Sequence, residues 1–155
     1  MTHVGIVEGA LTSELRRAVL RPNYDVGTPM FGDNDPHAIH VAAVEGGIAV
    51  SACVLVQRPY PRRPDARAAW QLRAMATAEG HRGKGFGALV VEAALEEVAG
   101  HGARLLWLEA REHAIGFYER FGLVAEGPVY LHPETKIRHR VMYRELSGVP
   151  STSVS

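Results

Sequence analysis

Six residues near the middle of the chain, Arg82-Gly83-Lys84-Gly85-Phe86-Gly87, have the composition of an anion-binding turn. Three glycines remove side chains where a ligand would approach, and they permit positive φ angles. If a helix begins at Phe86, its first N–H groups lack partners and carry partial positive charge. Arg82 and Lys84 add full positive charges. These residues fit a phosphate site at a helix N-terminus, and, taken alone, they fit a solvated glycine turn about equally well.

Two common nucleotide loops are excluded by the spacing. No Ser or Thr follows Lys84, so the turn is not a G-x-x-x-x-G-K-[S/T] phosphate loop. The glycines read G-x-G-x-G, which also differs from the dinucleotide-binding pattern G-x-G-x-x-G.

The turn needs an element on each side to hold it. Residues 66–77 before it are predicted to be extended, and 86–100 after it have apolar side chains at helical spacing, so we expect strand, turn, helix. Further helices are predicted at 11–20, with Thr12 or Ser13 as N-cap, and at 112–121. The further strands are expected at 3–8, 38–45, 48–58, 103–110, 123–130 and 137–146.

The connections narrow the topology. Gly46-Gly47 predicts a tight hairpin, and an apolar strand at 103–110 that follows a crossover helix predicts a parallel pair with 66–77. The loop at 23–37 is long enough to form a wall of a substrate site or to be a plain surface loop. We expect one domain over 1–146 and a flexible tail at 147–155.

Composition limits the functional class. The 155 residues carry a formal net charge of zero, which argues against general binding to nucleic acid or membrane. The single cysteine, Cys53, lies in an apolar run and is expected to be a core residue. His37 and His40 have no companion ligands, so no metal site is predicted. No signal peptide or membrane span is evident, and we expect a cytoplasmic protein.

Two motifs together resemble one family. The pattern Arg82-x-x-Gly85-x-Gly87 is similar to the acyl-CoA signature of the GNAT superfamily of acyl-CoA-dependent N-acyltransferases. The segment from Ala114 to Leu123, AIGFYERFGL, resembles a second element of that family, and LRAMAT at 72–77 resembles its fourth strand. The resemblance covers roughly residues 38 to 146. It implies an α/β (α+β) fold with a mixed, mostly antiparallel sheet of six to seven strands that splays between strands four and five.

The resemblance also implies roles for particular residues. The amides of the turn would bind the pyrophosphate of acetyl-CoA, and those of the fourth strand would run beside the pantetheine. Met75 would donate its amide to the thioester oxygen. The implied acetyl-CoA-binding residues are Met75, Ala76, Thr77, Arg82, Gly83, Lys84, Gly85, Phe86, Gly87, Arg111 and Phe117. At Arg111 many family members carry Asn, so Arg111 departs from the pattern.

Tyr118 matches the general acid of the family. A phenol, with a pKa of about 10, is protonated at neutral pH and can protonate a departing thiolate, whose thiol has a pKa of about 8.5. Glu109 and Glu79 are the candidate bases. His139 on the last strand is either a wall of the acceptor pocket or a packed histidine.

The sequence therefore favours an N-acetyltransferase that moves an acetyl group from acetyl-CoA to a primary amine by direct attack in a ternary complex. The resemblance also leaves open a homodimer. Two alternatives are a non-catalytic acyl-CoA-binding or sensing module on the same fold, and an ATP-binding protein that uses the glycine turn. The missing Ser or Thr after Lys84 disfavours the second.

Overall fold

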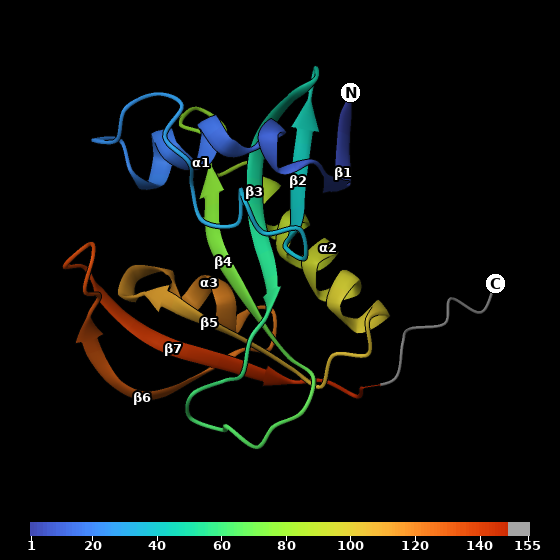
Figure 1. Ribbon diagram of the computed structural model, residues 1–155, viewed down its shortest axis with the longest axis vertical. Coiled ribbons are helices and arrows are strands. Elements are labelled where there is room, and N and C mark those ends of the chain that lie inside the picture. Colours follow the sequence, from blue (N-terminus) through green and yellow to red (C-terminus); the bar gives the residue numbers. More distant parts are fainter. Residues whose placement is uncertain (149–155) are drawn as a thin grey trace. The chain divides into compact units, whose positions relative to one another are not determined.

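The computed structural model describes residues 1–148 and contains one mixed sheet with the strand order β1-β2-β3-β4-β5-β7-β6 (Figure 1). The strand β4 is parallel to β5, and the predicted fold class is confirmed. The elements are β1 (Thr2–Val7), η1 (Gly9–Leu11), α1 (Ser13–Leu20), β2 (Ile39–Glu45), β3 (Ile48–Gln57), β4 (Ala69–Thr77), α2 (Phe86–Gly100), β5 (Leu105–Arg111), η2 (Glu112–Ala114), α3 (Ile115–Glu119), β6 (Val124–Leu131) and β7 (Arg138–Glu145).

The described residues form two compact units. Unit 1 comprises Met1–Val56 and Leu72–Glu97, and unit 2 comprises Gln57–Gln71 and the chain from Val98 onward. The single domain predicted over 1–146 stays a prediction. Of the predicted tail, positions 149–155 lie outside the described residues.

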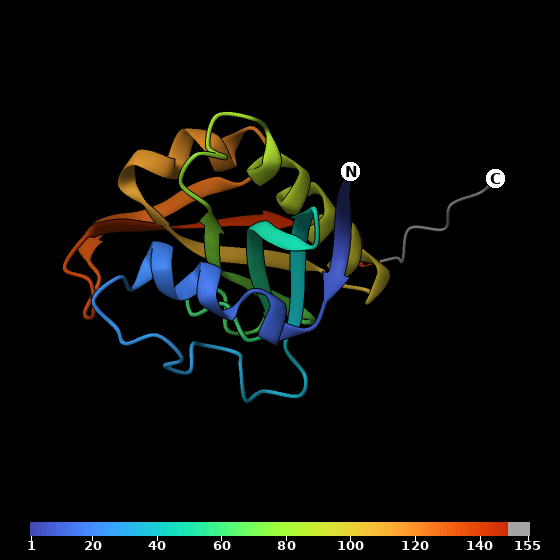
Figure 2. The ribbon, with the colours of Figure 1, turned by 90° about the horizontal axis from the view of Figure 1, so that it is seen from above.

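In unit 1 the antiparallel strands β1, β2 and β3 lie between two helices. Figures 1 and 2 show α1 and α2 on opposite faces of these strands. Leu15 of α1 packs against buried Ala42 and Ala52, whose small side chains allow close approach. The β2–β3 hairpin turns at Gly46 and Gly47, with φ of +59° and +80°, as the sequence predicted.

The helix predicted at 11–20 begins later in the structure, at Ser13, and Leu11 lies in η1. Leu11 is 44% exposed, whereas Arg16 of α1 is fully buried. Arg16 forms an ion pair with Asp33, and its Nη1 donates to the Phe31 carbonyl (2.8 Å). Since a buried charge needs a partner, tertiary contacts with the 21–38 loop decide which face of α1 is covered.

In unit 2 the strand β7 pairs with β5 on one side and β6 on the other. The segment before β4 is fixed by Tyr60, which stacks on Trp107 (5.5 Å between ring centroids) and on Tyr143 (5.6 Å). The Tyr60 hydroxyl donates to Glu126 (2.7 Å), and Arg63 pairs with the same carboxylate (2.9 Å). Burial, together with this hydrogen bond and the Glu126 charge, raises the pKa of Tyr60.

The parallel ladder between β4 and β5 is short. It pairs Ala69 with Leu105, Trp70 with Leu106, and Gln71 with Trp107, and the recorded register ends there. The recorded pairs do not include Leu72–Thr77, and the splay between strands four and five stays a prediction. No helix in the described part of the chain has the length and apolar character needed to cross a membrane.

Candidate functional site

The turn between β4 and α2 in unit 1 has open space at the positions that a Cβ atom on Gly83 or Gly85 would occupy. Gly83 and Gly85 have φ of +76° and +84°, and an added Cβ at either would meet nothing within 4 Å. The Gly85 carbonyl accepts the Leu89 amide (3.2 Å), which begins α2. The amides before it, those of Phe86, Gly87 and Ala88, lie in the first helical turn and have no intrahelical acceptor. The turn therefore has the backbone conformation, the space and the dipole that an anion site needs.

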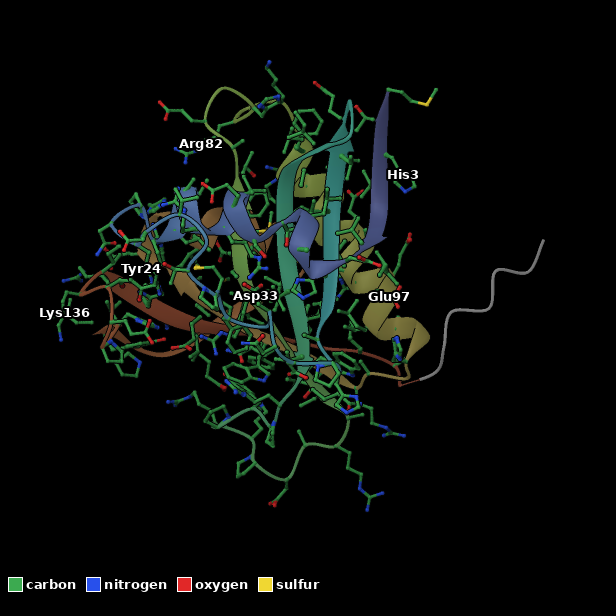
Figure 3. All side chains as sticks on the ribbon, turned by 45° about the horizontal axis from the view of Figure 1, so that its top comes forward. His3, Tyr24, Asp33, Arg82, Glu97 and Lys136 are labelled. Carbon is green, nitrogen blue, oxygen red and sulfur yellow. The ribbon has the colours of Figure 1, made fainter. Side chains whose placement is uncertain are left out.

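Two exposed cations accompany these amides. Figure 3 shows Arg82 on the turn beyond β4, and its Nε donates to the Thr77 carbonyl (3.3 Å). Lys84 is exposed. Glu79, one of the two candidate bases, is an exposed residue of the same turn.

The end of β4 contains a backbone irregularity that sequence reasoning missed. Ala74 has a φ of +54°, in the left-handed region that alanine rarely adopts. It lies between Arg73 and Met75, immediately before the predicted acetyl-CoA-binding residues of this strand. Such a residue breaks the alternation of a strand and re-aims the peptide groups beside it. Alanine gives no sequence signal for this conformation.

The angle at Ala74 leads to a stability prediction. Ala74→Val should lower the free energy of unfolding by about 1–2 kcal/mol relative to Ala74→Gly, because a β-branched residue clashes at positive φ and glycine does not. Urea denaturation of the two variants measures the difference. Equal midpoints and equal slopes would show that position 74 does not need the left-handed conformation.

Unit 2 holds the other predicted catalytic residues. Tyr118 is the buried residue of α3, 7% exposed, and its ring lies edge-on to Phe117 (5.1 Å). Phe117 is half-buried and also contacts Phe121 (5.2 Å). Arg111, the last residue of β5, is half-buried and lies opposite His139 in the β5–β7 ladder.

Glu109 of β5 is exposed, whereas its neighbours Leu108 and Ala110 are buried. The Tyr130 hydroxyl donates a hydrogen bond to its carboxylate. Burial, then the hydrogen bond and the charge of Glu109, raise the pKa of Tyr130. Tyr130 was not predicted as a site residue, since the contact depends on strand order and no local motif marks it.

The structure groups the predicted residues within each unit. Unit 1 brings together Met75, Ala76, Thr77 and the turn 82–87, and unit 2 holds Glu109, Arg111, Phe117 and Tyr118. Cys53 is fully buried, and burial raises the pKa of its thiol to about 12, which keeps the thiol protonated and unreactive at neutral pH. Among residues 1–148 no group of three or more His, Cys, Asp or Glu is placed to hold a metal ion.

The comparison with known families agrees with the resemblance of this glycine turn to an acyl-CoA signature. The model of the acetyltransferase (GNAT) family matches residues 9–123, most of the chain. The chain belongs to the GNAT acetyltransferase family, as the two sequence motifs indicated.

Individual relatives agree with this assignment. The chain is 29% identical over 136 residues to the uncharacterized N-acetyltransferase YitI of Bacillus subtilis (strain 168), a match that covers 87% of this chain and 90% of YitI. Its fold is similar to that of Escherichia coli ElaA, with a TM-score of 0.73 at 20% identity over 94% of this chain and 100% of ElaA. An aminoglycoside 6'-N-acetyltransferase complexed with coenzyme A gives a TM-score of 0.72 at 17% identity, over 97% of this chain and 99% of that enzyme.

Proposed function

We propose that this chain transfers an acetyl group from acetyl-CoA to a primary amine of an acceptor, by direct attack within a ternary complex. The observation that carries the proposal is the open glycine turn at the start of α2 in a member of the GNAT family. The similar aminoglycoside acetyltransferase holds coenzyme A, which supports acetyl-CoA as the cosubstrate here.

The acetyl-CoA contacts follow from the backbone. The turn amides and the charges of Arg82 and Lys84 would bind the pyrophosphate. Met75, Ala76 and Thr77 would lie along the pantetheine, with Arg111 and Phe117 as further contacts. Met75 follows the left-handed Ala74, and this irregularity supports its amide as the donor to the thioester oxygen.

The reaction balances with one proton released. The acceptor ammonium loses a proton, its nitrogen attacks the thioester carbonyl carbon, and a C–N bond forms. The C–S bond then breaks, and the sulfur takes a proton from the Tyr118 hydroxyl while the nitrogen loses its second proton. Tyr118 is reprotonated, so one proton reaches solvent for each acetyl group moved.

Glu109 is the proposed route for the first proton. Its carboxylate is exposed, so a proton taken there, directly or through water, passes to bulk solvent. A covalent acetyl-cysteine intermediate is not part of the proposal, because Cys53 is buried and its thiol pKa is raised to about 12.

Gly85 gives a test of the anion site. Gly85→Ala should weaken acetyl-CoA binding about tenfold, because a methyl group enters the approach to the amides and strains the turn. Calorimetry measures the dissociation constant. Gly27→Ala is the matched control, since Gly27 has a φ of +87° and equally open space in the 21–38 loop. Equal affinity of both variants and the wild type would contradict an anion site at the turn.

Release of CoA from acetyl-CoA with a panel of amines, including aminoglycosides and N-terminal peptides, tests the proposed reaction. Turnover with one amine class supports the transferase. Tight acetyl-CoA binding without turnover across the panel favours the alternative of a sensing module. A cytoplasmic location, a homodimer, and the lack of nucleic-acid and membrane partners stay predictions.

A further inference from the structure

Three side chains from different strands meet on one face of the unit 2 sheet. Tyr130 of β6 lies opposite His139 of β7, and Glu109 of β5 lies opposite Val141 of β7. Because β7 runs between β5 and β6, the Tyr130 side chain must cross β7 for its hydroxyl to reach Glu109. Residues that face each other across a ladder share one face of the sheet, so Glu109, Tyr130 and His139 gather there.

Glu109 differs from two other carboxylates of unit 2, Glu126 and Glu112. Glu126 is bound by Tyr60, Arg62 and Arg63, and Glu112 pairs with Arg138. Within the described residues, Glu109 forms no ion pair and has the Tyr130 hydroxyl as its hydrogen-bond partner. It is therefore an exposed carboxylate whose charge is not compensated by an ion pair and whose remaining lone pairs are open to a donor.

Two imidazole rings extend this group. The His139 Nδ1 lies 2.9 Å from the Ile137 carbonyl, which can only accept, so Nδ1 donates there, and Nε2 is the acceptor in that neutral tautomer. The His132 Nδ1 accepts the Glu134 amide (3.3 Å). The ring centroid of His139 lies 4.9 Å from that of His132 and 6.1 Å from that of Tyr130. We call Glu109, Tyr130, His132 and His139 the Glu109 cluster.

The chemistry of the cluster selects a cation that donates hydrogen bonds. It presents the Glu109 carboxylate, a ring nitrogen that accepts, and aromatic faces that attract positive charge, with the Arg111 guanidinium two residues along β5 and opposite His139. Diagonal neighbours such as Glu109 and His139 stand about 7–8 Å apart at the backbone. An ammonium nitrogen that donates hydrogen bonds of about 2.9 Å to two acceptors holds those acceptors up to about 6 Å apart. The Glu109 and His139 side chains can meet this distance if they lean toward each other.

We propose that the Glu109 cluster binds the acceptor as a primary ammonium group, with Glu109 and the His139 Nε2 accepting its N–H bonds and the Tyr130 hydroxyl holding Glu109 in place. This inference rests on the proposed function and adds to it the site that receives the amine. Tyr130 is a positioning residue here, and the rings of Tyr130 and His132 contact the carbon chain beside the nitrogen.

A binding experiment tests the site without any need for turnover. The probes are n-butylammonium chloride, neutral n-butanol and sodium butyrate, which have similar chains and different charge. Each is titrated into the full chain while the imidazole proton signals of His132 and His139 are followed by NMR, with His139→Gln used for assignment. We expect a saturable shift with butylammonium at about millimolar concentration, and no saturable shift with butanol.

Glu109→Gln keeps the size of the side chain and removes its charge, so the butylammonium shift should weaken about tenfold or more. Saturation by butyrate instead would overturn the proposal and point to the guanidinium of Arg111, which lies opposite His139. An unsaturable response to all three probes, or an equal response of Glu109→Gln and wild type to butylammonium, would also overturn it.

The KM for the acceptor then tests whether Tyr130 positions Glu109 or only supports the structure. Tyr130→Phe should raise the KM for the acceptor about three- to tenfold with little change in the KM for acetyl-CoA, because Glu109 loses the bond that orients it. Tyr60→Phe is the matched control, since it removes a tyrosine–carboxylate bond of 2.7 Å elsewhere in unit 2. The control should lose stability and keep the acceptor KM. An equal change of acceptor KM in both variants would assign Tyr130 a structural role.

The two proposals fail in different ways. Saturable binding of butylammonium that depends on Glu109, with no turnover of any amine, would contradict the transferase and keep the ammonium site. Turnover whose acceptor KM does not respond to Glu109→Gln or Tyr130→Phe would keep the transferase and reject this site.

Discussion

Tyr118→Phe is expected to lower kcat about 100-fold or more and to leave the affinity for acetyl-CoA within about twofold, because general acid catalysis typically contributes ~10²–10⁴ in rate. The variant keeps the ring that fills the buried position on α3 and removes only the hydroxyl. Steady-state CoA release gives kcat, and calorimetry gives the affinity.

Loss of structure must be separated from loss of the acid. Removing a buried hydroxyl costs about 1 kcal/mol, so Tyr118→Phe should remain folded at assay temperature. Tyr143→Phe is the control, since its hydroxyl accepts a hydrogen bond from Arg63 (2.7 Å) and has no proposed chemical role. A kcat for Tyr118→Phe equal to that of the control would remove Tyr118 from the mechanism.

The largest expected effect on stability belongs to the ion pair between Arg16 and Asp33 in unit 1. Asp33→Ala leaves the guanidinium of a fully buried arginine without its carboxylate, and breaking a buried pair in this way costs about 3–5 kcal/mol. For a chain of this length the melting temperature should fall by roughly 6–20 °C. Thermal and urea unfolding measure both quantities.

The matched control lies on the same helix. Glu14→Ala breaks the exposed pair between Glu14 and Arg17, which water already screens, so the melting temperature should barely change. The double variant Arg16→Met/Asp33→Ala should be more stable than Asp33→Ala, because no buried charge is left unpaired. Equal loss in the Glu14 and Asp33 variants would show that the buried pair adds nothing beyond an exposed one.

The pH dependence of stability gives an independent check. Burial raises the pKa of Asp33. The hydrogen bonds from the Met30 amide, the Arg16 guanidinium and the Ser13 hydroxyl, and the charge of Arg16, lower it by more, so the net pKa is below its usual range. The stabilisation is therefore complete above the unfolded pKa of about 3.9 and is lost as pH falls through the lower, folded value. Wild type should lose more stability below pH ~4 than Asp33→Ala does.

The ion pair between Arg16 and Asp33 also bears on the loop at 23–37, which the sequence left open as a wall of a substrate site. Arg16 holds the 21–38 loop through Asp33 and the Phe31 carbonyl, and the Phe31 ring lies under the Arg73 guanidinium (3.7 Å to the centroid). The loop is thus tied to both α1 and β4. If the loop forms a wall of the substrate site, as the sequence left open, Asp33→Ala should raise the acceptor KM as well as lower stability.

The sequence by itself predicted the turns and the helix whose conformations depend on residues that are adjacent in the chain. The glycine turn at 82–87, the helix after it and the hairpin at Gly46-Gly47 all follow from conformations that few residue types allow. The family followed from two such local motifs in order, and the match over 9–123 agrees.

Tertiary structure decided what depends on residues far apart in the chain. Arg16 is buried because Asp33, in a loop with no regular pattern, supplies its partner. Ala74 adopts a left-handed angle that alanine does not favour alone, so packing and the chain on both sides must impose it. Tyr130 reaches Glu109 only because β7 inserts between β5 and β6 and places them on one face. Contacts between residues far apart in the sequence leave no local sequence pattern. They stabilise the protein only after the chain has folded and brought those residues together.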